Sequence, residues 1–201
     1  MTDADVACWS ARCEEHVISC MAGDPAHDLA HVRRVVAWAR RLAEIEGADL
    51  AVVAPAAWLH DLVTVTKASP ERARASRISA EAATQWLRAE GYPEAHLLAV
   101  AHAIEAHSFT AGIPPETLEA EVVQDADRLD ALGAIGLARM YAMSAVFGSQ
   151  IVHPDDPVPA EPPTRPLDDK QWATDHLFVK LFRLPTTMRT EAGRAEAKRR
   201  V

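Results

Sequence analysis

Apolar residues recur at helical spacing along almost the whole chain. Between residues 3 and 21 they stand three or four positions apart, at Val6, Trp9, Cys13, Val17 and Cys20, which places them on one face of a helix. No segment alternates apolar and polar residues over a useful length, and the chain contains no internal repeat. The pattern therefore predicts an all-α fold, a helical bundle formed by one domain over residues 1–201.

Capping residues predict several helix limits. Asp28 precedes an apolar stripe that runs to about residue 46, and Gly47 follows it, so we expect a helix over roughly 29–46 with these two residues as its caps. Ser69 with Pro70, and later Pro93, open two further helical patterns, the first of which stops at Gly91.

Two helical patterns carry a potential break. Pro55 lies inside "DLAVVAPAAWLHDL", where its missing N–H predicts a late start or a kink. The segment from Pro114 to Gly148 is one long helix or two, with Gly133 and Gly136 as the candidate break points.

A proline-rich stretch then interrupts the helices. Residues 149–166 include six prolines between His153 and Pro166, so we expect a surface excursion rather than a helix. Residues 167–201 return to helical spacing and predict two C-terminal helices, "DDKQWATDHLFVKLFRLP" and "TTMRTEAGRAEAKRRV".

Composition and charge restrict the possible partners. The net charge is -8 and the pI is near 5.6, so we expect no nucleic-acid polymer and no membrane as partner. No apolar stretch approaches ~20 residues, and the N-terminus lacks the order of a signal peptide. These features predict a cytoplasmic protein, in which Cys8, Cys13 and Cys20 are small packing residues. The 49% hydrophobic content favours a homodimer.

The segment "WLHDLV" places two polar residues in an apolar run. A buried carboxylate such as Asp61 costs several kcal/mol unless it is paired, and His60 adjoins it. His31 and Asp127 lie in similar surroundings, and imidazole with carboxylate suits a divalent transition metal. The pattern alone leaves the plainer interpretation open, in which these histidines are ordinary polar residues and the aspartates near Asp127 are caps or a solvated helix face.

The order His31, His60-Asp61, Asp127 resembles the H…HD…D signature of the HD-domain metal-dependent phosphohydrolase superfamily. The matching stretches include "AHDLAHVRRV", "AIEAHSF" and "VVQDADRLDALGAIGLAR". The chain is most similar to a small stand-alone bacterial branch that carries "K-x-x-P-x-R-x-x-x-S" after the HD pair, here Lys67, Pro70, Arg72 and Ser76. That branch also has a tail like "RPLDDK…DH…K…LP…M", so the resemblance runs from about residue 20 to near the end.

The resemblance implies that His31, His60, Asp61 and Asp127 bind one divalent metal ion. We expect Mn, Fe, Co or Ni, with Mg less suited to this ligand set. Asp125 is the fallback for Asp127. Many members of the superfamily have an acid three residues after the HD aspartate, where this chain has Thr64, so another group must manage the proton or the metal-activated water needs little help.

Other residues are candidates for substrate contact. Because the chain is acidic overall, phosphate groups need local cations, and we expect them at Lys67, Arg72, Arg128 and Lys170. Two of these have a structural alternative: Arg72 can be a solvated helix residue, and Arg128 can form an ion pair with Asp125 or Glu121. Arg34 is expected to orient a carboxylate rather than to touch substrate.

Two further histidines, His102 and His107, lie five residues apart in one helical pattern. His107, in "AHSF", matches the related branch and is a catalytic candidate beside Asp61, whereas His102 is expected in packing or on the surface.

The predicted function is hydrolysis of a phosphate ester or anhydride, with a nucleotide as the small anionic substrate. A bound divalent ion lowers the pKa of water and polarises a phosphoryl oxygen. The alternatives are a non-catalytic HD module that senses nucleotide or is stabilised by metal, a dinuclear-iron HD oxygenase, and a helical interaction protein without metal. The sequence leaves the substrate, the bond that is cut, the metal and the oligomeric state open.

Overall fold

The computed structural model describes residues 1–20, 28–63 and 70–201. A bundle is formed by six helices, with the 3-10 helix η1 (Pro70–Arg74) leading into the fourth. They are α1 (Asp3–Cys20), α2 (Leu29–Glu46), α3 (Leu50–Leu59), α4 (Ala75–Ala89), α5 (Glu94–His107) and α6 (Leu118–Asp130). The predicted all-α fold is confirmed, since the described residues contain helices and a single isolated bridge, Gln150 with Trp172.

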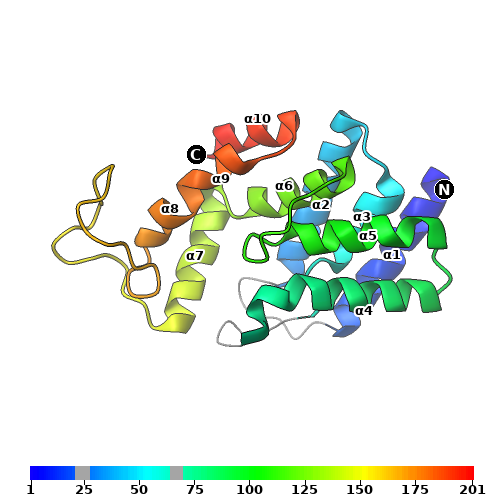
Figure 1. Ribbon diagram of the computed structural model, residues 1–201, viewed down its shortest axis with the longest axis horizontal. Helices are drawn as coiled ribbons and strands as arrows, with labels where there is room; N and C mark the ends of the chain where they lie inside the picture. The colour runs from blue at the N-terminus through cyan, green and yellow to red at the C-terminus, as the bar shows by residue number, and fades with distance from the viewer. Residues whose placement is uncertain (21–27, 64–69) are drawn as a thin grey trace.

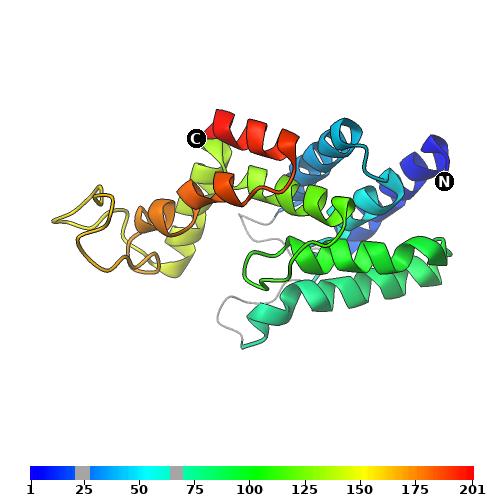
Figure 2. The same cartoon turned by 45° about the horizontal axis from the view of Figure 1, so that its top comes forward.

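The second half of the chain extends beyond this bundle and then returns to it. Helix α7 (Gly133–Phe147) leads away from α6, and the loop after it lies at the far left of Figures 1 and 2. The return path consists of α8 (Asp175–Val179), η2 (Leu181–Arg183), α9 (Leu184–Thr187) and α10 (Glu191–Arg200). Helix α10 packs against α2 and α6. One cluster of buried apolar residues therefore runs from Cys13 to Ala197.

The predicted limits of α2 are confirmed. Asp28 is its N-cap and accepts a hydrogen bond of 2.8 Å from the backbone N–H of His31. Gly47 ends the helix in the left-handed conformation, with φ at 80°, which a glycine adopts without steric cost. This cap fixes His31 in the first turn of the helix.

Of the two outcomes predicted from Pro55, a late start or a kink, the late start of α3 is wrong. The helix begins at Leu50, where Asp49 caps it, and it continues through the buried Pro55. Proline has no N–H to donate to the carbonyl four residues earlier, which belongs to Ala51. The hydroxyl of Tyr92 donates to that carbonyl instead, so a partner from outside the helix replaces the missing bond.

The segment after Pro114 forms two helices, and the break lies just before Gly133, the first residue of α7, whereas Gly136 lies within α7. Helices α6 and α7 meet at 72°. Gly133 has φ at 72°, and a Cβ atom on Gly136 would lie 2.1 Å from the carbonyl oxygen of Ala131. The sharp junction therefore needs glycine for two reasons, a left-handed backbone and a close approach.

The C-terminal segment differs from the prediction. No helix covers residues 168–174, and the first predicted helix is reduced to the short elements α8, η2 and α9. The buried carboxylate of Asp175 explains the difference, because it accepts bonds from the side chain of Arg165 and from the backbone N–H of Asp168. These bonds hold residues 168–174 in turns. The second predicted helix is present as α10.

The described residues of 149–166 contain no helix, as the proline content predicts. Of the three cysteines, only Cys13 is buried, and Cys8 and Cys20 are exposed. The expectation of three packing residues is therefore wrong for Cys8 and Cys20.

Among the described residues, no single helix has both the length and the apolar composition to cross a membrane. Helices α6 and α7 meet that criterion only when they are counted together, across their bend of 72°.

Candidate metal centre

The C-terminal end of α3 places His60 and Asp61 side by side. Helix α3 ends at Leu59, and His60 is its C-cap with Asp61 in the following turn. Adjacent side chains inside a helix diverge by about 100°, but a helix end allows both to face the same point. His60 is fully buried, and its Nδ1 atom lies 2.8 Å from the carbonyl oxygen of Ala57.

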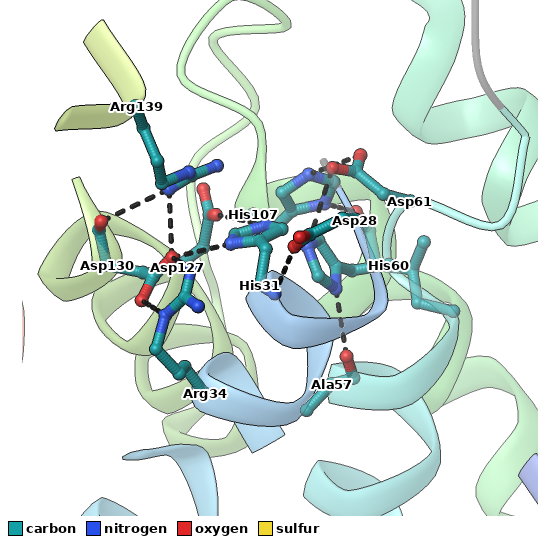
Figure 3. Close-up of polar contacts among 11 residues, drawn as sticks. Asp28, His31, Arg34, Ala57, His60, Asp61, His107, Asp127, Asp130 and Arg139 are labelled. Carbon is teal, nitrogen blue, oxygen red and sulfur yellow. Dashed lines mark hydrogen bonds and ion pairs between the residues drawn. The ribbon is translucent and has the colours of Figure 1, made fainter. Parts of the chain in front are cut away.

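Three other helices bring side chains to the same point. His31 comes from the first turn of α2, His107 from the last turn of α5, and Asp127 from α6. Figure 3 shows these residues facing His60 and Asp61. We call His31, His60, Asp61, His107 and Asp127 the His/Asp cluster. Potential ligand atoms of His31, His60 and Asp127 lie within 4.8 Å of one another, and so do those of His60, Asp61 and His107.

Each imidazole of the cluster presents Nε2 to its centre. The Nε2 atoms of His31 and His107 lie 3.6 Å from oxygens of Asp127 and Asp61, respectively. The Nε2 atom of His60 lies 3.5 Å from the other oxygen of Asp61. The Nδ1 atoms all point outward, toward Asp130, Ala57 and Ile104.

Burial and charge shift the pKa values within the cluster in different directions. Burial lowers the pKa of His60 to about 4, because the charged imidazolium loses its hydration. Burial acts the same way on His107, but the hydrogen bond and negative charge of Asp61 outweigh it and raise that pKa. Burial alone would raise the pKa of Asp127, yet the nearby His60, His107 and His31 hold it below its usual value.

These residues fit a divalent transition metal. The Nε2 atom of His60 is buried and has no hydrogen-bond partner among the described residues. Burying an unsatisfied nitrogen is costly, and a cation bound there would remove that cost. Imidazole nitrogens with carboxylate oxygens are the donors that Mn²⁺, Fe²⁺, Co²⁺ and Ni²⁺ accept.

The structure separates the predicted ligand from its fallback. Asp125 lies two residues before Asp127 on α6. Its carboxylate, however, accepts bonds from the backbone N–H groups of Arg189 and Thr190 and from the Thr190 hydroxyl. It therefore ties the start of α10 to α6 and does not contribute to the cluster. His102 is also elsewhere, since its Nε2 accepts from the backbone N–H of Glu116.

The predicted phosphate-binding cations fall into two groups. Lys67 and the side chain of Arg72 lie outside the described residues, and so does Thr64, which stands in place of the acid. Arg128 is buried next to Asp127 and donates to the carbonyl of Thr187. The negative charge of Asp125 also acts on its guanidinium group. Lys170 is exposed in a turn, and its carbonyl accepts from Ser149.

Three residues near the cluster were not singled out as ligands or cations by the sequence. Asp130 lies one turn after Asp127 and accepts a bond of 2.7 Å from His31 Nδ1. It also accepts bonds from Arg34 and Arg139, which confirms that Arg34 orients a carboxylate. Phe109 follows His107, and its ring lies beside Arg128 and Lys180. The i, i+3 spacing of Asp127 and Asp130 is the signal that could have indicated Asp130.

Comparison with known proteins gives the class to which this fold and cluster belong. Residues 28–132 match the family model of the HD domain, and the chain belongs to that family. It is 33% identical over 178 residues to the uncharacterized protein YpgQ of Bacillus subtilis, covering 87% of this chain and 77% of that protein.

Solved structures extend the comparison. B. subtilis YpgQ in complex with ADP has a TM-score of 0.70 at 32% identity, with 94% of this chain and 89% of that chain covered. An HD-superfamily hydrolase from Bacillus thuringiensis has the same TM-score at 30% identity, with 99% and 90% covered. The predicted HD-type fold and family are confirmed.

Proposed function

We propose that this protein is a metal-dependent phosphohydrolase that acts on a phosphate ester or anhydride of a nucleotide. His31, His60, Asp61 and Asp127 would hold one divalent transition metal ion. The observation that carries the proposal is the convergence of five potential ligand side chains from four separate helical segments, in two overlapping groups that share the buried His60. A bound ion would supply Lewis-acid polarisation of a phosphoryl oxygen and activation of water.

His107 is proposed to move the proton that the missing acid at position 64 would otherwise manage. Its Nδ1–H donates to the carbonyl of Ile104, over 2.6 Å, so Nε2 is the atom that faces Asp61. In the neutral ring Nε2 accepts a proton, and in the charged ring it donates one. The hydrogen bond and the negative charge of Asp61 outweigh burial and raise the pKa of His107 above its usual value, which favours the charged ring.

Charge on the transferred phosphoryl group must be balanced by cations of this chain. Lys67 and Arg72 keep this proposed role on the strength of the sequence pattern. Arg128 contributes a charge beside Asp127, although its Nη1 atom is committed to Thr187, 2.7 Å away. Lys170 stays a prediction, as an exposed residue whose described backbone contacts are with Asp168 and Ser149.

The nucleotide is proposed from two facts that support each other. The site needs an anionic ligand that can reach a metal ion, and the structure of a 32% identical relative is described as a complex with ADP. The second candidate function, a nucleotide sensor without turnover, is favoured by Thr64. A dinuclear oxygenase centre has one supporting observation, the overlapping group of His60, Asp61 and His107.

A screen of metals and nucleotides tests the proposal. The purified protein is stripped with chelator and reloaded with Mn²⁺, Fe²⁺, Co²⁺ or Ni²⁺. It is then incubated with nucleoside mono-, di- and triphosphates, and products are identified by ³¹P NMR. We expect hydrolysis that depends on the metal. Asp61→Ala should lower kcat at least about 100-fold, whereas His102→Ala, a histidine outside the cluster, should retain activity.

The alternatives give distinct outcomes in the same screen. Tight nucleotide binding by calorimetry with no product from any metal would favour the sensor. Consumption of O₂ by the iron-loaded protein would favour the dinuclear centre. Absence of metal from the wild-type protein after gentle purification and reloading would overturn the proposal.

A further inference from the structure

The imidazole of His31 is oriented differently from the other two in the cluster. His60 and His107 each direct Nδ1 to the carbonyl three residues earlier in their own helix, Ala57 and Ile104. For His31 the residue three positions earlier is the N-cap Asp28. The Asp28 carboxylate accepts the backbone N–H of His31, and its carbonyl accepts from Val32. The Nδ1 atom of His31 is instead directed to a side chain of another helix.

The carboxylate of Asp130, on α6, is the hydrogen-bond acceptor for Nδ1 of His31. Its Oδ2 atom lies 2.7 Å from His31 Nδ1, across 99 positions of sequence. An ionised carboxylate only accepts hydrogen bonds, so the contact requires a proton on Nδ1, and in the neutral ring it leaves the lone pair of Nε2 facing the cluster. A metal ligand needs that tautomer.

Asp130 is in turn held by two guanidinium groups. Arg34 of α2 donates to both carboxylate oxygens, over 2.7 and 3.0 Å, and Arg139 of α7 donates to Oδ2 over 2.9 Å. Figure 3 shows Arg34 and Arg139 reaching Asp130 from these two helices. Asp130 is only 2% exposed, and burying an unpaired carboxylate would be costly. The two arginines compensate that cost and keep the carboxylate ionised beside His31.

We infer that Asp130 is a positioning residue of the metal site, which fixes the tautomer and the ring orientation of His31. Arg139 of α7 assists by holding the Asp130 carboxylate in place. The inference rests on the proposed function and deepens it, because it names what prepares one ligand before the ion binds. Partners of this kind typically change metal affinity 10–100-fold when they are altered.

The decisive variant is Asp130→Asn, which keeps the shape but can donate as well as accept. Its carboxamide N–H₂ can bond to an unprotonated Nδ1 and so allow the tautomer with the proton on Nε2. We expect Mn²⁺ affinity, measured by competition with a chelator, to fall about 10–100-fold. In the metal-free protein, ¹⁵N-resolved NMR of the histidine rings should show His31 with Nδ1 protonated in the wild type and a mixture of tautomers in the variant.

Asp125→Asn is the matched control. Asp125 is equally buried on the same helix, and its carboxylate accepts hydrogen bonds from Arg189 and Thr190, away from the cluster. This variant should lose thermal stability but keep Mn²⁺ affinity and the His31 tautomer. If Asp130→Asn does not fold, Arg139→Gln removes one donor to the carboxylate while leaving Asp130 in place, and it should weaken Mn²⁺ binding in the same direction but less.

The possible results are distinguishable. A wild-type protein that binds no divalent metal contradicts the proposed function itself. A wild type that binds Mn²⁺, together with an Asp130→Asn protein of equal affinity and unchanged His31 tautomer, overturns only the positioning role. If Asp130→Asn does not fold, unchanged affinity in Arg139→Gln overturns the role of Arg139.

Discussion

At the scale of single residues, the environment of each histidine decides what its imidazole can do. His60 and His107 make the same bond at Nδ1, and their ring centroids are 4.9 Å apart. Their pKa values nevertheless shift in opposite directions, because burial dominates at His60 whereas Asp61 outweighs burial at His107. Two residues of one type, side by side, are therefore suited to different tasks.

A pH titration of the metal-free protein by histidine NMR tests this contrast. We expect His107 to take up a proton first as the pH falls, and His60 to stay neutral until about pH 4. The unfolded chain protonates His60 near pH 6.5, so the unfolded state binds that proton more tightly. The contribution of His60 to the free energy of unfolding is therefore intact above pH 6.5 and decreases as the pH falls toward 4. Protonation of His60 before His107 would contradict the assignment.

The candidate ligands could be predicted from the sequence, but the residue that orients His31 could not. The motif order pointed to His31, His60, Asp61 and Asp127, whose side chains the structure brings together. The bond between His31 and Asp130 joins residues 99 positions apart. The i, i+3 spacing places Asp130 on the same face of α6 as Asp127, but it does not encode which helix the Asp130 carboxylate contacts. Asp125 and Asp127 are both embedded among apolar residues, and only packing separates their roles.

At the scale of helices, caps and glycines set limits that the sequence predicts well. Asp28, Gly47 and Gly133 mark the ends of α2 and the start of α7 because each one satisfies or permits a particular backbone geometry. The turns at residues 168–174 could not be predicted in the same way. There the carboxylate of Asp175 accepts bonds from the Arg165 side chain and the Asp168 backbone N–H, and these bonds compete with helix formation. Tertiary contacts override local propensity there.

The junction of α6 and α7 gives a prediction at this scale. Gly136→Ala would place a Cβ atom 2.1 Å from the carbonyl oxygen of Ala131, so α7 must shift relative to α6. We expect a loss of about 1–3 kcal/mol in the free energy of unfolding, measured by urea denaturation.

Ala138→Ser, at an exposed position of the same helix, is the control and should change stability by about 0.5 kcal/mol or less. Equal stability of Gly136→Ala and the wild type would show that the junction relaxes without cost.

At the scale of the whole molecule, the cluster joins parts of the chain that are distant in sequence. His31, His60, His107 and Asp127 come from α2, the end of α3, α5 and α6. These four helices belong to the bundle of α1 to α6, whereas α7 to α10 add to it from one side (Figure 1). An ion held by these residues would therefore connect the elements that make the fold, and it would bind the folded state in preference to the unfolded chain.

Metal removal should accordingly lower thermal stability. With free Mn²⁺ at about 100 times its dissociation constant, binding adds about 2.7 kcal/mol to the free energy of unfolding. For a chain of this size that corresponds to a shift of about 5–10 °C in melting temperature, measured by calorimetry with Mn²⁺ and with excess chelator. His60→Ala should abolish the shift and His102→Ala should keep it. A melting temperature that is independent of Mn²⁺ would argue against a metal centre.

The bond between Arg139 and Asp130 affects how genetic data on this protein should be interpreted. Arg139 belongs to α7, which has no ligand in the cluster, yet it holds the carboxylate that contacts His31. We therefore expect a random mutagenesis screen to recover inactive clones altered in α7. A map of the active site drawn from such clones would include a helix that need not contact the substrate. Assaying the metal content of each clone would identify those that are inactive because they have lost the metal.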